Sequence, residues 1–270
     1  MKKALILAAS SLLITLHTTA QPVTKELKEV LQLPVTREGG ANGAAVAWHP
    51  VLKRYYTAIG GNVNFPLDVF DIMGKRVSDG TETTLFDIRG LWYNPKRKTL
   101  QMNGYNDFGW AEYKLNTKGI PVDTLLLHGG MNQPFEQSAG AFNPQENIVY
   151  FLNENGQLEK YDYNTAAYLE TRDLYLGLTE DEDDGLSVNA EVIDNYNTTV
   201  VIFTRIKGAE IGVLNHVNLE IELYNLADGY ITRILKLPEG APVNSRLNFS
   251  YSNGIYWLFD KETRVWKGYK

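Results

Sequence analysis

The chain contains no cysteine. That absence excludes disulfide bonds, metal sites built on thiolates and a lipid anchor attached through cysteine. The fold must therefore be stabilised by apolar burial and hydrogen bonding alone, and some 250 residues are enough for one well-packed domain.

Signatures of catalysis and cofactor binding are also missing. The sequence has no G-x-S-x-G nucleophile motif, no Walker loop, no H-E-x-x-H pair and no Rossmann fingerprint. Beyond the first twenty residues there are three histidines, His49, His128 and His216, and no two have the spacing of metal ligands. We predict no cofactor, and we favour a protein that is not an enzyme while leaving catalysis open.

Long apolar runs are absent after the N-terminus. Lys2 and Lys3 precede an apolar stretch over 4–16, and Thr18-Thr19-Ala20 offers small residues for cleavage before Gln21. This pattern predicts a signal peptide over 1–20 and a single domain over 21–270, with export to the periplasm or beyond. An uncleaved membrane anchor is the alternative, and we expect no membrane span in the mature chain.

Positive charge is scarce. The formal net charge is −6, and lysine and arginine are scattered along the sequence with no basic stripe. Nucleic acid and anionic membrane surfaces are therefore not expected as partners. The 16 tyrosines and 5 tryptophans suit β-strands, and they also suit sugar or peptide ligands that stack on rings.

A short motif recurs at nearly equal spacing. Its three copies are Trp48-His49-Pro50, Tyr93-Asn94-Pro95 and Phe142-Asn143-Pro144, with prolines 45 and 49 residues apart. A period of 40 to 50 residues built from short strands is typical of a β-propeller.

Each of the first four repeats divides into four expected strands. The first unit has strands over 44–48, 54–59, 67–72 and 83–88, and the fourth has strands over 187–193, 198–206, 217–224 and 230–237. The fifth unit has only three, over 246–251, 255–260 and 264–269.

The strand missing from the fifth unit is expected at the N-terminus. Val30-Leu31-Gln32-Leu33-Pro34 resembles Ile234-Leu235-Lys236-Leu237-Pro238, which is the outer strand of the fourth unit. We therefore predict an all-β, five-bladed β-propeller of four-stranded blades, in which residues 27–33 complete the last blade and remove its open edge. A β-sandwich or barrel, or a sixth blade within 177–215, remains the alternative.

This organisation resembles bacterial propeller repeat proteins of the broad WD40-like or NHL-like kind. The resemblance covers nearly the whole mature chain, but the Gly-His to Trp-Asp repeat of WD40 proteins is absent. The resemblance implies the fold, and no functional residue is transferred from it.

The repeat residues themselves have a structural interpretation. Asparagine followed by proline is turn chemistry, and His49 occupies the asparagine position of its turn. Trp48, Trp92, Tyr93 and Phe142 are interpreted as core residues between blades rather than as ligand-stacking rings.

The loops between the second and third strands suggest a polar binding face. They are rich in asparagine and glycine and carry rings that look exposed. Amides and carboxylates beside rings suit hydroxyl-rich ligands, although asparagine and glycine are also common in ordinary hairpins. The candidate ligand-binding residues, including two arginines near the channel mouth, are Phe65, Tyr105, Asp107, Phe108, Arg89 and Arg246.

Three carboxylates near the expected channel mouth are candidates for catalysis. Asp87 and Glu136 each lie eight residues before a repeat proline, and Glu191 lies near the next junction. A pair of such carboxylates 5–9 Å apart is what a glycoside hydrolase uses. Pairing of these groups with arginine, or their solvation, is the alternative.

An acidic run offers a possible calcium loop. Glu180, Glu182, Asp184 and Glu191 match oxygen-ligand positions of the EF-hand pattern, but glutamate replaces the expected aspartate twice. We interpret the run as a solvated acidic loop.

The sequence therefore favours an exported binding module for a glycan, a peptide or an envelope protein. The rival hypotheses are a carbohydrate-active enzyme, with its carboxylates in the channel, and a structural partner in the cell envelope, with a large exposed apolar patch.

Overall fold

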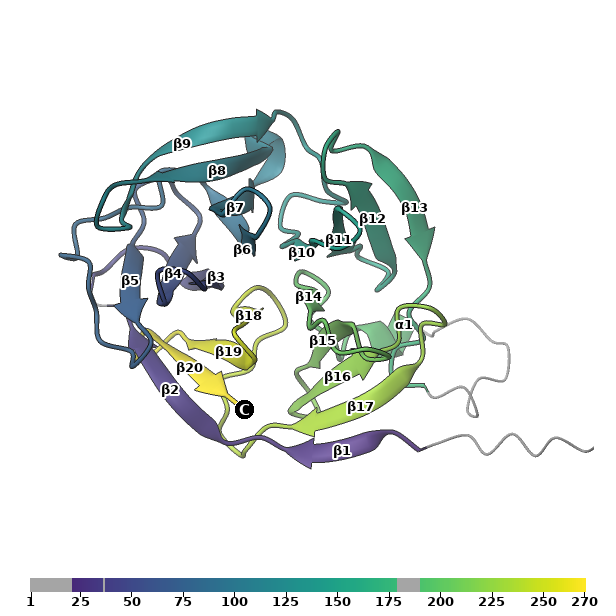
Figure 1. Ribbon diagram of the computed structural model, residues 1–270. Helices are drawn as coiled ribbons and strands as arrows, with labels where there is room; N and C mark the ends of the chain where they lie inside the picture. The colour runs from purple at the N-terminus through teal and green to yellow at the C-terminus, as the bar shows by residue number, and fades with distance from the viewer. Residues whose placement is uncertain (1–20, 36, 179–189) are drawn as a thin grey trace, which may run out of the picture.

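Five small sheets surround a central axis, so the fold is a five-bladed β-propeller as predicted (Figure 1). The structure is a computed structural model that describes residues 21–35, 37–178 and 190–270. Among these residues, no helix is long and apolar enough to cross a membrane.

The blades follow one another along the chain, and each runs from an innermost strand outward. The first blade has β3 (Asn42–His49), β4 (Arg54–Gly60) and β5 (Leu67–Asp71), and the second has β6 (Ile88–Asn94), β7 (Thr99–Gly104), β8 (Trp110–Leu115) and β9 (Pro121–His128). The third has β10 (Ala141–Asn143), β11 (Ile148–Leu152), β12 (Leu158–Asp162) and β13 (Tyr168–Arg172), and the fourth has β14 (Ile202–Phe203), β15 (Ile211–Asn215), β16 (Glu220–Tyr224) and β17 (Ile231–Lys236). The fifth has β18 (Phe249–Ser252), β19 (Ile255–Asp260) and β20 (Val265–Tyr269).

The core is divided among the five contacts between neighbouring blades. Alternate side chains of a strand point to opposite faces of its sheet, so each blade packs against both of its neighbours. Tyr56 packs between the first and second blades, whereas Tyr55 and Phe70 pack between the fifth and first. The other three contacts each have their own apolar cluster. The ring of blades therefore encloses the channel on all sides.

The N-terminal segment closes the ring. Strand β2 (Glu29–Pro34) pairs antiparallel with β20 and completes the fifth blade, which confirms the predicted closure. Strand β1 (Val23–Glu26) was not predicted, and it pairs parallel with β17 on the outer edge of the fourth blade (Figure 1). Leu27 is buried between the fourth and fifth blades and Leu33 between the fifth and first. One segment therefore fastens three blades together.

The first blade departs from the expected pattern at its outer edge. The strand predicted over 83–88 is wrong, because residues beyond β5 form only isolated bridges, Phe70 with Arg76 and Pro66 with Thr83. Between these bridges, the Asp79 and Glu82 carboxylates accept hydrogen bonds from nearby backbone N–H groups. Local bonds of this kind compete with a regular strand ladder.

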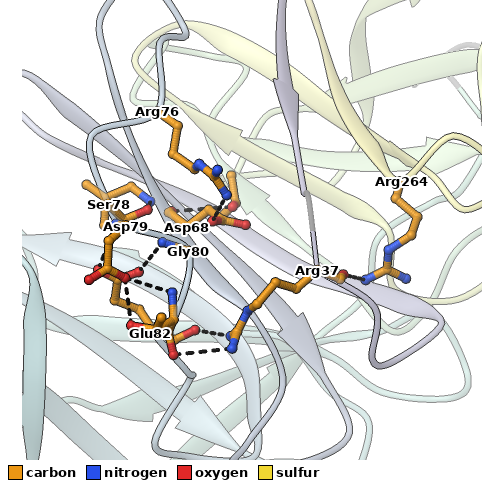
Figure 2. Close-up of polar contacts among 11 residues, drawn as sticks. Arg37, Asp68, Arg76, Ser78, Asp79, Gly80, Glu82 and Arg264 are labelled. Carbon is orange, nitrogen blue, oxygen red and sulfur yellow. Dashed lines mark hydrogen bonds and ion pairs between the residues drawn. The ribbon is translucent and has the colours of Figure 1, made fainter.

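Arg37 and Arg264 fasten this irregular edge to the fifth blade (Figure 2). Arg37 donates hydrogen bonds to the carbonyl groups of Thr81 and Glu82, and Arg264 donates to the carbonyl group of Arg37. Asp68 is almost fully buried beneath this edge, with one carboxylate oxygen 3.5 Å from Arg76 and the other without a hydrogen-bond partner. Burial raises the pKa of Asp68, with Arg76 acting against that shift.

The fourth blade also differs from the prediction. Its innermost strand was expected over 187–193, but the described part of that range is the helix α1 (Ala190–Ile193). The innermost strand is β14, which lies inside the range predicted for the second strand. The actual second strand, β15, was missed. No proline marks the turn after β14, so the spacing of the motif gave no guide to its position.

Candidate binding site in the central channel

The channel contains a cavity of about 390 Å³, lined by the innermost strands of all five blades. Its walls include small residues such as Ala44, Gly90 and Ala141, which leave the axis open. We call the end where each innermost strand turns into the second strand, as at His49-Pro50, the hairpin end. We call the opposite end, where the chain enters each innermost strand, as at Asp87-Ile88, the junction end.

A ring of aromatic side chains surrounds the cavity near the hairpin end. Each blade contributes one residue from the last or next-to-last position of its innermost strand. We name this set the aromatic collar: Trp48, Tyr93, Phe142, Phe203 and Tyr251. Phe142 is buried and the other four are half-buried, so most of the collar keeps some accessible surface. Trp48 and Tyr93 pack against the apolar clusters between blades, as expected, and they also line the cavity.

The collar rings are held in place by neighbouring rings. Trp48 lies 4.5 Å from Tyr55 between ring centroids, and Tyr251 lies 4.9 Å from Tyr256. Phe203 stacks on Tyr150 of the preceding blade at 5.8 Å. Such contacts fix the ring positions before any ligand arrives, which reduces the entropy cost of binding.

The residue after each collar ring has a structural role. Asn94 and Asn143 each accept a backbone hydrogen bond, at 3.0 Å, from the residue two positions ahead, as the turn chemistry predicted. The His49 ring nitrogen accepts one from Leu52 at 3.3 Å, and burial lowers the pKa of His49. These contacts agree with the structural interpretation of His49.

Sequence reasoning found only three of the five collar positions. In the fourth blade Phe203 precedes Thr204, whose hydroxyl accepts the Ile206 N–H at 3.0 Å. In the fifth blade Tyr251 precedes Ser252, which accepts the Trp257 indole N–H at 3.0 Å. The shared signal is an aromatic residue followed by a polar residue whose side chain accepts a hydrogen bond, and requiring proline concealed it.

At the junction end, several of the sequence-predicted residues lie together. Arg89 forms an ion pair with Asp87 at 2.7 Å and donates to the Gln137 side chain at 2.8 Å. Its guanidinium also lies 4.6 Å from the centre of the Tyr105 ring. A hydrogen bond to the Glu136 carboxylate raises the pKa of Tyr105. The structure thus joins Asp87, Arg89, Tyr105 and Glu136 into one cluster.

This cluster uses its charges internally. Arg89 is 4% exposed, and Asp87 accepts a further hydrogen bond from the Gly61 N–H at 2.9 Å. A general acid or nucleophile must reach its substrate, and Asp87 is engaged by an arginine instead. Glu136 is exposed, and the side chain of Glu191 lies outside the described residues.

The remaining candidates at the junction end do not converge. Phe65 is half-buried against the cluster between the fifth and first blades, contrary to its expected exposure. Phe108 is 40% exposed and rests edge-on against Phe86 at 5.3 Å. Asp107, in the short 3-10 helix η1 (Asn106–Phe108), and Arg246 are both exposed and have no contact with the Arg89 cluster in the described structure.

The described residues give no support to a metal centre. The calcium-loop positions Glu180, Glu182 and Asp184 lie outside the described residues, as does the side chain of Glu191. Within the described ranges, no group of three or more histidine, aspartate or glutamate side chains could hold a metal ion.

Comparisons with known proteins support the fold. No protein-family model matches the chain, and no curated protein matches it in sequence. The structure is similar to the crystal structure of Myxococcus xanthus glutaminyl cyclase, with a TM-score of 0.58 and 10% identity over 93% of this chain and 98% of that one. A chain of a nidogen/laminin complex matches with a TM-score of 0.43 and 13% identity over 75% of this chain and 66% of that one, too distant for any argument. At 10% identity the first likeness shows the propeller architecture alone.

Proposed function

We propose that this protein is an exported binding module that takes an apolar or ring-shaped part of its ligand into the central cavity from the hairpin end. The observation that carries the proposal is the aromatic collar, since every blade contributes at least one ring to the wall of a single cavity. Ligand pockets are typically concave, mostly apolar and largely formed before binding.

The size of the cavity limits what enters it. At about 390 Å³ it lies near the lower end of the range for small-molecule pockets, so it holds one group of a ligand rather than a long chain. A side chain or terminus of a peptide, or one unit of a glycan, fits this description. The rest of a larger ligand would lie on the hairpin end.

Catalysis has less support than binding. Among the described residues, no carboxylate or histidine lines the cavity, and Arg205 is the only charged residue that does. Glycoside hydrolysis needs two carboxylates, and cyclisation of an N-terminal glutamine needs groups that transfer protons. We expect no ammonia release from a peptide that begins with glutamine, and no hydrolysis of glycans.

The proposed export agrees with the position of the first strands. Cleavage before Gln21 would leave β1 and β2 in the mature chain, and both strands take part in closing the ring. The test is the intact mass of the protein from the periplasmic and extracellular fractions. A mature chain beginning at Gln21 is expected, whereas a protein retained whole in the membrane would contradict export.

The test of the binding site compares ring removals at different places. The mature protein is screened on glycan and peptide arrays together with Trp48→Ala and Tyr251→Ala. Tyr168→Ala removes a ring that is 54% exposed on β13 and serves as the matched control. We expect the affinity for the ligand found on the arrays to fall by more than tenfold in both collar variants and to stay unchanged in the control.

A second variant tests whether the ligand binds at the hairpin end or at the junction end of the channel. Tyr105→Ala combined with Phe108→Ala alters the junction end and leaves the collar intact. Binding that survives in the collar variants but is lost in this double variant would contradict the proposal and move the site to the junction end.

A further inference from the structure

The hairpin end is positively charged although the whole chain is negative. The loops that join first and second strands, over 50–53, 95–98, 144–147, 204–210 and 253–254, carry six cationic residues and two carboxylates. The cations are Lys53, Lys96, Arg97, Lys98, Arg205 and Lys207, and the carboxylates are Glu146 and Glu210. These residues are scattered in the sequence because they come from different blades, and the fold gathers them around one opening.

Most of this positive charge is not neutralised by a partner. Arg97 is paired with Glu112 at 2.8 Å, and Lys96 donates to the Asn147 side chain at 2.9 Å. The side chains of Lys53, Lys98, Arg205 and Lys207 have no hydrogen bond or ion pair within the described structure.

The two carboxylates of these loops are already engaged. Glu210 accepts hydrogen bonds from the Gly208 and Leu226 N–H groups, and Glu146 accepts one from the Tyr150 hydroxyl. These neutral donors leave both negative charges in place, but the six cations outnumber Glu146, Glu210 and the Glu112 that pairs with Arg97, so the net charge at the opening is positive.

Arg205 is the cation placed to contact a bound molecule. It is exposed, lies two residues after the collar ring Phe203 and itself lines the cavity. It is also close enough to the collar ring Tyr251 to act electrostatically on that hydroxyl.

Three of these cations have a backbone conformation that is unfavourable for most residues with a Cβ atom. Lys53, Lys98 and Arg205 have φ angles of 53°, 58° and 64°. This left-handed conformation suits glycine or asparagine, and the loops of the third and fifth blades have Asn147 and Asn253 there. Three loops thus carry a cation where local stability favours asparagine.

We propose that the ligand of the cavity is an apolar or aromatic group that bears a carboxylate, with the group inside the collar and the carboxylate on Arg205. This proposal rests on the proposed function and specifies its ligand class. A guanidinium binds a carboxylate through two parallel hydrogen bonds, and Lys53, Lys98 and Lys207 add a field that attracts the anion. The carboxylate can belong to a small free acid or to the C-terminus of a peptide.

The test uses pairs of probes that differ only in charge. Affinities of the mature protein for 3-phenylpropanoate and 3-phenylpropanamide are measured by calorimetry or NMR titration at low salt. The peptide Ala-Ala-Phe is measured with a free C-terminal carboxylate and with a C-terminal amide. We expect each acid to bind about tenfold or more tightly than its amide. If 3-phenylpropanoate binds more tightly than the peptide acid, the natural ligand is a small free acid. If the peptide acid binds more tightly, the carboxylate belongs to a peptide C-terminus.

Two substitutions locate the effect. Arg205→Gln should reduce the preference for acid over amide to about twofold or less, mainly by weakening the binding of the acid. Lys261→Gln removes an exposed cation from the loop between β19 and β20, at the junction end, and should leave the preference unchanged.

Equal binding of acid and amide would overturn this inference and leave the proposed cavity site standing. If neither the acids nor the amides bind, the inference is overturned. The array experiment with the collar variants then still decides whether the cavity is a binding site. A preference for the acid that persists in Arg205→Gln would also overturn the assignment.

Discussion

Arg89 and Arg205 lie at opposite ends of the channel, and their surroundings differ sharply. Arg89 is buried and its guanidinium contacts Asp87, Gln137, the Ile88 carbonyl and the Tyr105 ring. Arg205 is exposed beside the cavity and has neither an ion-pair nor a hydrogen-bond partner among the described residues. A charge that is fully engaged maintains the fold, whereas one kept without a partner is available to a ligand.

The same contrast holds for the aromatic residues of the two ends. Tyr105 is occupied by Arg89 and Glu136, and Phe65 packs against the core. The collar rings are supported from behind by other rings and line a cavity in front. The comparison teaches that a concentration of polar and aromatic residues in the sequence does not by itself mark a ligand site.

The largest expected effect is on stability, from removing Arg89. Arg89→Ala leaves Asp87 at the junction end without its cation, so we expect a loss of about 3 kcal/mol in the free energy of unfolding. Arg205→Ala should change that free energy by no more than about 0.5 kcal/mol. Denaturant unfolding of both variants measures the difference, and similar losses would remove the distinction between the two arginines.

At the hairpin end we expect a smaller change in stability, and of opposite sign. Lys53→Asn combined with Lys98→Asn relieves two left-handed lysines, so stability should rise by about 0.5 kcal/mol for each substitution. The acid probes should nevertheless bind more weakly, because part of the attracting field is lost. Lower stability would show that the lysines carry no conformational cost at these positions, and unchanged affinity for the acids would show that they do not contribute to binding.

Asp68 provides a third arrangement, a buried carboxylate with incomplete compensation. Its pKa is raised in the folded protein, so the folded state holds the proton more tightly and stability falls as pH rises above the unfolded pKa, which is near 3.8. Asp68→Asn should therefore raise the melting temperature at neutral pH, and the gain should shrink as the pH falls toward 4. A variant less stable at pH 7 would show that the contact with Arg76 outweighs the cost of burial.

The architecture was predictable because its signals are local and repeated. Asn94 and Asn143 mark turns directly, and the likeness of residues 30–34 to 234–238 revealed the closure by β2. The irregular edge around Asp79 was not predictable, since side chains that bond to nearby backbone override strand propensity there. Strand β1 was missed because four exposed residues carry no pattern of burial.

The candidate site was less accessible to sequence reasoning. Phe203 and Tyr251 belong to the collar, but their turns lack the proline that identified the other copies. Lys53, Lys98 and Arg205 lie far apart in the chain, and only the ring of blades brings their loops to one opening. Charge clustering across blades is a property of the fold that a linear scan does not detect.

The most direct test is to soak crystals of the mature protein with 3-phenylpropanoate and to determine the structure. The account predicts the phenyl ring inside the collar and the carboxylate within hydrogen-bond distance of the Arg205 guanidinium. A probe bound instead beside Arg89 and Tyr105, or a cavity without density at saturating probe, would contradict it.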